Sequence, residues 1–302
     1  MGMQINTNLA ANNTYRNLNA TQNDLSKSLE KLSSGLRINR AADDAAGLSI
    51  SEGLRSQVGG LTVAARNAQD GISVVQTAEG ALTEVHSILQ RVRDLAVQSG
   101  NDSNNADARG AIQTEVTALT KELSRISEST NFNGIKLLDA SANPVTAGGN
   151  DGGKLTFQVG AGSTASADQI TVDLSKANIA QLSDNLTTGF TVGTGADAIT
   201  YEGLDFSSAE GALASIKTID SQIKAVSSVR SELGAVQNRF EHSIASSNVA
   251  KENLTAAGSR IRDVDMAEEM VKYTRSNVLS QAGQAMLAQA NQSTQGVLSL
   301  LR

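Results

Sequence analysis

A long, regular spacing of apolar residues constrains this chain most. Between Leu54 and Ala96, apolar side chains recur at alternating steps of four and three residues, with one shortened step after Val75. This heptad spacing is typical of helices that pack along their length, and the shortened step indicates local overwinding. The positions are Leu54, Val58, Leu61, Ala65, Ala68, Ile72, Val75, Ala78, Leu82, Val85, Leu89, Val92 and Ala96. We expect one helix from about Ala45 to Ser99, roughly 80 Å long at ~1.5 Å per residue.

The two ends of the chain carry almost no charge. Residues 1–23 contain one charged side chain, Arg16, and residues 276–301 contain none. The N-terminal end nevertheless has a heptad seam, although it is rich in asparagine, a weak helix former. The seam positions are Ala11, Tyr15, Leu18, Gln22, Leu25, Leu29, Leu32 and Leu36. We expect both ends to fold fully only where a partner covers them, because an uncharged face can be buried without stranding a charge.

The remaining segments alternate between helix and strand patterns. Apolar periodicity predicts a third helix through Ile112–Ile126 and a long helix from Ser208 towards Leu254. We expect a last helix from about Asp263 to Leu301. Between them, Lys154–Val159 and Gln169–Leu174 alternate in polarity around a Gly/Ser/Thr loop, which predicts a β-hairpin. The stretches at residues 190–192 and 198–202 are candidates for two further short strands.

Composition argues against several classes of function. The net charge is −6 and the pI about 5.1, whereas nucleic-acid binding needs clustered Lys and Arg. His86 and His242 belong to no metalloprotease motif, and no nucleotide-binding P-loop motif is present. No apolar run approaches the ~20 residues of a membrane span, and the first residues lack the basic and apolar regions of a cleaved secretory signal. We therefore expect no enzyme, cofactor, metal site or membrane insertion.

Several ordered blocks resemble the two ends of bacterial flagellins. Towards the N-terminus they are LEKLSSGLRINRAADDAAGLSIS (29–51), NAQDGISVVQTAEGAL (67–82), LQRVRDLAVQSGN (89–101) and NFNGIKLLD (131–139). Towards the C-terminus they are ENLTAAGSRIRDVDMAEEM (252–270), LSQAGQAMLAQANQ and VLSLLR. The resemblance covers roughly residues 1–140 and 205–302 and leaves out the glycine-rich middle, where flagellins differ most.

The resemblance implies an architecture that agrees with the periodicity. We expect a mainly α fold of long antiparallel helices with a terminal coiled coil and a small β-hairpin-containing insert in the middle of the chain. The expected segments are 1–44 and 259–302 (two halves of an inner coiled-coil domain), 45–142 and 207–258 (two halves of a helical shell domain) and 143–206 (a β-rich Gly/Ser/Thr insert).

The resemblance also implies a function and a set of partners. The chain would be a structural subunit that self-assembles into the helical flagellar filament used for motility, its terminal segments folding into a coiled coil on assembly. It would be extracellular, exported by the flagellar secretion apparatus without a cleaved signal peptide. Besides other copies of itself, its partners would be an export chaperone at the C-terminal helix, filament cap and hook–filament junction proteins, and a host Toll-like receptor.

Three groups of residues are candidate sites. The assembly seam comprises Leu18, Leu25, Leu29, Leu32, Leu36, Met270, Met286 and Leu298. The candidates for setting subunit register, which on a simpler interpretation are helix caps in solvated turns, are Arg37, Arg40, Asp43, Asp44, Arg260, Arg262 and Asp263. The resemblance adds Arg91, Leu95 and Glu115, at positions that flagellins of this class present to the receptor; Asp94 stands where relatives often have Glu.

Two other interpretations stay open from the sequence. A hook–filament junction protein would share the terminal helices but adapt or cap a filament instead of building it. A cytosolic coiled-coil protein or a membrane-surface helix protein would also show heptads. Surface binding to membranes usually needs Lys and Arg on the polar face, and residues 276–301 have neither.

Overall fold

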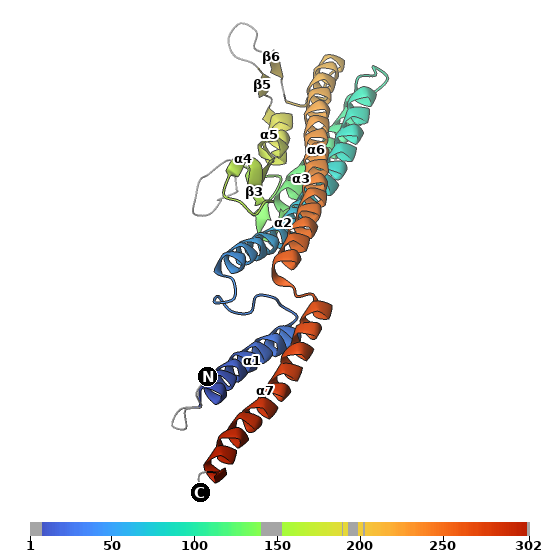
Figure 1. The fold of residues 1–302 in the computed structure, drawn as a ribbon. Helices are drawn as coiled ribbons and strands as arrows, with labels where there is room; N and C mark the ends of the chain where they lie inside the picture. Colours follow the sequence, from blue (N-terminus) through green and yellow to red (C-terminus); the bar gives the residue numbers. More distant parts are fainter. Residues whose placement is uncertain (1–7, 140–152, 189, 193–198, 202, 301–302) are drawn as a thin grey trace. The chain divides into compact units, whose positions relative to one another are not determined.

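Long helices make up most of the described chain. The computed structural model describes residues 8–139, 153–188, 190–192, 199–201 and 203–300 (Figure 1). The long helices are α1 (Leu9–Ser34), α2 (Ala45–Ser99), α3 (Ala106–Ser129), α6 (Ala209–Arg262) and α7 (Met266–Leu300). The chain separates into two compact units, a terminal unit (residues up to Gly59 and from Lys251 on) and a central unit (Gly60–Ala250). The predicted mainly α fold is confirmed.

In the central unit, α2 lies antiparallel to both α3 and α6. Two ion pairs connect α2 and α6: Arg93 with Asp220 at 2.7 Å, and Glu79 with Arg230 at 3.9 Å. The earlier residue of α2 pairs with the later residue of α6, so the two helices are antiparallel. The predicted heptad of α2 forms the core that these helices share. Its fully buried members are Ala68, Val75, Ala78, Leu82, Val85, Leu89, Val92 and Ala96. The heptad thus predicted both the helix and its buried face.

The middle of the chain contains two antiparallel strand pairs, as expected. Strand β3 (Lys154–Gln158) pairs with β4 (Gln169–Asp173), with Leu155 opposite Val172. Strand β5 (Phe190–Val192) pairs with β6 (Ile199–Tyr201). A short helix α4 (Ala165–Asp168) precedes β4. In addition, β1 (Asn131–Phe132) and β2 (Ile135–Lys136) form a small hairpin whose turn residues, Asn133 and Gly134, both have positive φ.

A helix that the sequence pattern did not predict lies in the same region. After the 3₁₀ turn η1 (Ser175–Ala177), helix α5 (Ile179–Thr188) packs along α3. Its apolar side chains Ile179, Leu182 and Leu186 recur at helical spacing and are buried. The carboxamide oxygen of Asn178 accepts a hydrogen bond from the Gln181 N–H and caps the helix. The insert expected at residues 143–206 therefore contains a helix as well as strands, because only a helix places these three apolar side chains on the same face.

In the terminal unit, α1 and α7 lie side by side and antiparallel (Figure 1). Asn8 caps α1 through its oxygen and donates through Nδ2 to the carbonyl of Ala290 at 3.0 Å. Further along, a Cβ atom added at Gly283 would lie 3.3 Å from Leu18 Cδ1, so the glycine marks a close approach of the two helices. The expected coiled coil between the chain termini is present.

Candidate assembly surface

The face of α1 that packs on α7 differs in one respect from the expected seam. Leu18, Leu25 and Leu32 are half-buried, and the intervening position is taken by Ser28, which is buried. Leu29, a predicted member of this seam, is 53% exposed. The helix turns 3.6 residues each round, so Ser28 and Leu29 lie about 100° apart and only one can face α7. Leu29 thus belongs to an outer apolar face of α1, together with Tyr15, which is also exposed.

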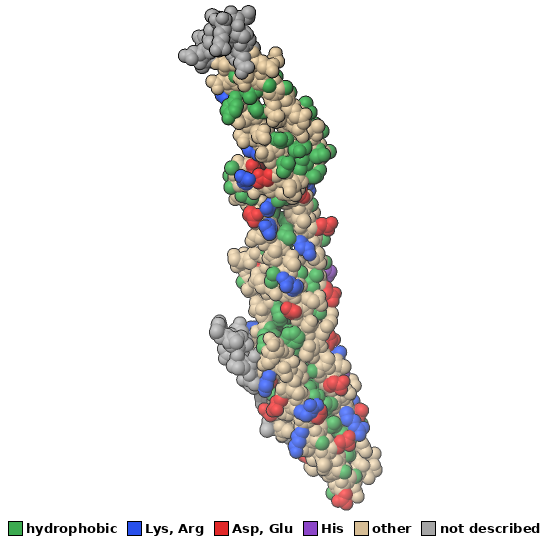
Figure 2. Space-filling model, turned by 90° about the horizontal axis from the view of Figure 1, so that it is seen from below, with side chains coloured by type: hydrophobic (Ala, Val, Ile, Leu, Met, Phe, Trp, Pro, Cys, Tyr) green, Lys and Arg blue, Asp and Glu red, His purple; other side chains and the backbone are tan. Residues whose placement is uncertain are grey.

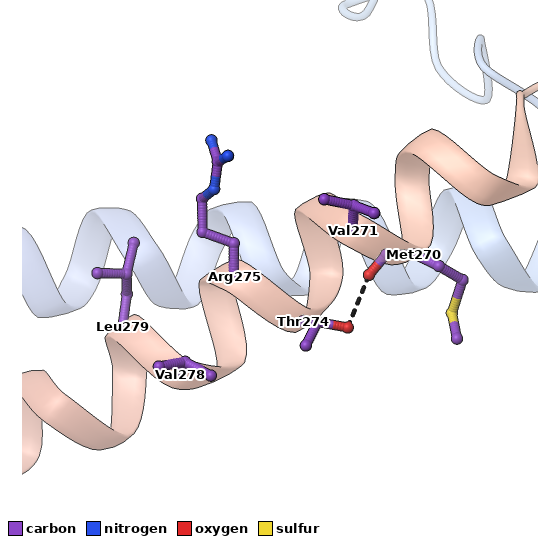
Figure 3. A pocket seen from close by; sticks show the side chains of 6 residues that line it. All are labelled: Met270, Val271, Thr274, Arg275, Val278 and Leu279. Atoms are coloured by element: carbon purple, nitrogen blue, oxygen red, sulfur yellow. Dashed lines mark hydrogen bonds between the residues drawn. The ribbon is translucent and has the colours of Figure 1, made fainter.

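Helix α7 likewise exposes large apolar side chains. Met270 is 52% exposed and Met286 62% exposed, and Val271, Val278 and Leu279 are exposed as well. Met270, Val271, Val278 and Leu279 border a shallow depression, which Figure 3 shows with Arg275 as its one charged lining residue. Leu298, the last of the expected seam residues, has its side chain outside the described residues. Contiguous exposed apolar surface of this kind marks interaction sites.

Backbone hydrogen bonds connect the segment that follows α1 to the connection between α6 and α7. We call this region, around residues 35–44 and 260–264, the joint. Helix α1 ends at Gly35, whose φ of 73° lies in the left-handed region that favours glycine. The Arg37 N–H then donates to the Arg262 carbonyl at 2.6 Å, and the Val264 N–H donates to the Gly35 carbonyl at 3.1 Å. Leu36 and Asp263 thereby form an antiparallel bridge. The bridge holds the segment after α1 against the connection between α6 and α7.

The arginines around this joint bind groups that the sequence pattern did not indicate. The Arg37 guanidinium donates to the Ile261 carbonyl, with Nη2 at 2.6 Å, and so satisfies a carbonyl at the end of α6. Arg40 pairs with Glu30 at 2.9 Å, and Arg262 pairs with Glu52 at 3.0 Å. Neither glutamate lies three or four residues from its arginine, so the spacing of ion pairs within a helix could not have predicted these pairs.

The aspartates at the joint shape turns and helix starts. The Asp43 carboxylate accepts hydrogen bonds from the backbone N–H groups of Arg40 and Asn39, and these bonds lower the pKa of Asp43. Asp44 accepts from the Gly47 N–H at 2.8 Å in the first turn of α2. Asp263 accepts from the Ser259 hydroxyl. The Asp43 and Asp44 contacts are those of a turn and a helix cap, the Asp263 contact is between two side chains, and Arg260 is exposed.

The proposed receptor residues lie on the central unit and differ in accessibility. Arg91 of α2 pairs with Glu115 of α3 through Nη2 and Oε1 at 2.7 Å, and both side chains are largely exposed. Leu95 is 2% exposed and belongs to the core. The accessible part of this group is therefore the Arg91–Glu115 pair. Elsewhere, His86 contacts Gln90 within its own helix, and His242 is exposed.

Two structural findings bear on other classes of function. Within the described residues, acidic and histidine side chains form no group that could hold a metal ion, and the helices are neither long nor apolar enough in any window to cross a membrane. On the face drawn in Figure 2, Lys and Arg side chains are interspersed with Asp and Glu. The exposed large apolar side chains of α1 and α7 are candidates for contact with a partner.

Comparison with known proteins decides the family. The model of the bacterial flagellin N-terminal helical region matches residues 5–143, and that of the C-terminal helical region matches residues 216–301. A flagellin of Halalkalibacterium halodurans is 51% identical over 300 residues, spanning 99% of this chain and 100% of the relative. A flagellin of Bacillus subtilis is 50% identical over 307 residues, with coverage of 99% and 100%. The chain belongs to the bacterial flagellin family.

Membership of the flagellin family carries a definite function. This flagellin chain is a structural subunit of the extracellular flagellar filament used for motility, and not an enzyme. Nothing in the comparisons favours a junction protein or a cytosolic coiled-coil protein. Among solved structures, a crystal structure of Bacillus cereus flagellin aligns with 28% identity and a TM-score of 0.47, covering 60% of this chain and 88% of that one.

Proposed function

We propose that the terminal unit is the element that drives assembly, with α1 and α7 ordering fully as the subunit joins the filament. The observation that carries this proposal is the exposed apolar surface of both helices, above all Leu29, Met270, Val278 and Met286. Fixing a residue's backbone costs about 1–2 kcal/mol, and burying a large apolar side chain returns about 1.5–3 kcal/mol. In an isolated subunit the exposed apolar side chains of these helices are not buried, so this stabilisation is missing. Contacts with neighbouring copies bury them and provide it.

The proposal also assigns a role to the charged residues of the joint. We infer that Arg37, Arg40, Asp43, Asp44, Arg260, Arg262 and Asp263 fix the register between neighbouring subunits, because partly exposed charges select an orientation more than they add affinity. Within one subunit, Arg40 and Arg262 are already paired with glutamates. On joining the filament, these charges would meet those of adjacent copies. The domain boundaries proposed from the sequence, at residues 44/45 and 258/259, lie close to this joint.

Further partners belong to the same proposal. An export chaperone would cover the apolar face of α7 before secretion by the flagellar apparatus, which would need no cleaved signal peptide. Cap and hook–filament junction proteins would meet the same helices at the two ends of the filament. A host Toll-like receptor would bind around Arg91 and Glu115, with Leu95 supporting that surface from the core.

A seeded polymerisation experiment tests the assembly proposal. Purified subunits are added to short filament seeds, and elongation is followed by light scattering and electron microscopy. The full chain should elongate the seeds, and a chain lacking residues 277–302 should not. Circular dichroism of both monomers is the control, because the central unit should keep its helicity in each. Normal filaments from the truncated chain would refute the proposal.

A further inference from the structure

The sulfur-containing side chains of the described residues all lie on one helix. The sequence has five methionines and no cysteine or tryptophan. Met1 and Met3 lie outside the described residues, and the other three, Met266, Met270 and Met286, all belong to α7. None of these three belongs to the buried core. The thioether groups that the structure describes are therefore on the helix to which we assign assembly.

Met270 and Met286 lie away from the side of α7 that faces α1. Met270 borders the depression of Figure 3, where its side chain extends away from the helix, and it is 52% exposed. Met286 is 62% exposed and lies about two helical turns beyond Leu279, on the same side of the helix. The side that faces α1 carries the buried Ser280 instead. Both thioether side chains are thus accessible to solvent in an isolated subunit.

Accessible thioethers react with peroxides. The sulfur lone pair attacks one oxygen of hydrogen peroxide, so that an S–O bond forms, the O–O bond breaks and the second oxygen leaves as water. The methionine, oxidised by two electrons, becomes a sulfoxide. Because the sequence has no cysteine, no thiol of this chain competes for the oxidant. The reaction converts a flexible apolar side chain into a polar one at the same position.

We propose that Met270 and Met286 form an oxidation-sensitive site that controls whether a subunit can join the filament. This inference rests on the assembly role proposed above for α7. In the filament, neighbouring copies bury both side chains. A sulfoxide oxygen at either position then needs a hydrogen-bond donor, which an apolar contact does not provide. Peroxide therefore blocks a free subunit but does not reach the methionines of one already assembled. Enzymatic reduction of the sulfoxides reverses the block.

Peroxide treatment of the full-length chain tests this proposal. Monomers and seeded filaments receive hydrogen peroxide at the same concentration, and peptide mass spectrometry measures the sulfoxide at each methionine. Met270 and Met286 should oxidise several-fold more slowly in filaments, because neighbouring copies cover them. Monomers with both sulfoxides should elongate seeds roughly tenfold more slowly, the factor that corresponds to one buried polar group without a hydrogen bond. Methionine sulfoxide reductases should return elongation to the untreated rate.

Leucine variants assign the effect to particular side chains. Met270→Leu combined with Met286→Leu conserves side-chain volume and removes both sulfur atoms. After peroxide, this double variant should elongate seeds as fast as its own untreated sample. Met266→Leu is the matched control, because Met266 is 48% exposed in the first turn of the same helix and does not line the depression. It should lose elongation after peroxide as the unaltered chain does.

Two results would overturn the proposal. One is normal elongation by monomers that carry both sulfoxides. The other is an equal loss after peroxide in the double variant and in Met266→Leu, which would place the damage elsewhere. If the untreated double variant does not elongate, reductase treatment of the oxidised unaltered chain decides, and a loss that reduction does not reverse contradicts the proposal.

The truncated chain separates this proposal from the assembly proposal. If a chain without residues 277–302 still forms filaments, the assembly role of α7 is wrong. If that chain is inactive while the doubly oxidised subunit elongates normally, the assembly role stands and only the oxidation-sensitive site is wrong.

Discussion

Phe240 of α6 lies so close to Gly71 of α2 that a Cβ atom added at Gly71 would come within 2.7 Å of the ring carbon Cζ. The Phe240 ring is fully buried and meets Phe157 of β3 edge-on, with ring centroids 5.6 Å apart. Because the ring cannot swing away into solvent, the glycine is required for this packing. The contact joins α2, α6 and the first strand of the insert at one point.

The first prediction uses this contact and a matched glycine on the same helix. Gly71→Ala should lower the free energy of unfolding by about 1–2 kcal/mol, because overpacking costs more than alanine gains in helix propensity. Gly80 has open space around its Cβ position. Gly80→Ala should therefore raise the free energy of unfolding by up to ~1 kcal/mol. Denaturant titration, monitored by circular dichroism, measures both free energies of unfolding. A change of the same sign in the two variants would contradict the close packing of Phe240 on Gly71.

The second prediction concerns the outer apolar face of the terminal helices. Replacing Val278 with Asp should abolish seeded elongation, because a charge would be buried in the subunit interface. The monomer should keep its melting temperature, because Val278 is exposed there. The control is Val249→Asp, an equally exposed valine on α6, which should leave elongation closer to normal. Elongation by the Val278 variant at the normal rate would exclude this face from the interface.

The third prediction concerns the arginine that binds the end of α6. Arg37→Ala removes the hydrogen bonds to the Ile261 carbonyl and should destabilise the joint by about 1 kcal/mol. Amide exchange at Val264 and Arg37 should become faster, because both N–H groups lie in the bridge that Arg37 supports. Arg260→Ala, which removes an exposed arginine nearby, should change stability by less than about 0.5 kcal/mol.

The fourth prediction is a pH dependence at the same joint. The pKa of Asp43 is lowered by hydrogen bonds from the Arg40 and Asn39 N–H groups. The unfolded chain then binds the proton more tightly than the folded turn, so protonation favours opening. The turn should keep its full stability above about pH 4, the ordinary range of an aspartate, and lose it as the pH falls further. Amide shifts of Asn39 and Arg40 report this, and Asp43→Asn should remove most of the dependence.

Helices α1, α2, α3 and α6 could be predicted from sequence because their apolar residues recur at helical spacing. Helix α5 could not, because three apolar residues among Asn, Ser and Thr resemble a loop until α3 is present to cover them. The seam of α1 shows a different limit. Ser28 and Leu29 are neighbours, and the apolar one faces outward, because this helix also carries apolar residues outside the face that packs on α7. Periodicity identifies apolar residues and does not say which of two faces meets the chain's own partner.

The bridge between Leu36 and Asp263 also bears on the order in which the chain folds. Arg37 and Ile261 are 224 positions apart, so pairing them in an unfolded chain closes a very long loop. Once α2 and α6 have paired in the central unit, the loop still to be closed is several times shorter, and the entropic cost falls by roughly 1 kcal/mol. The central helices should therefore form first and the two ends last. A newly made chain keeps its ends unpaired for the longest time, which is the interval in which another molecule can bind them.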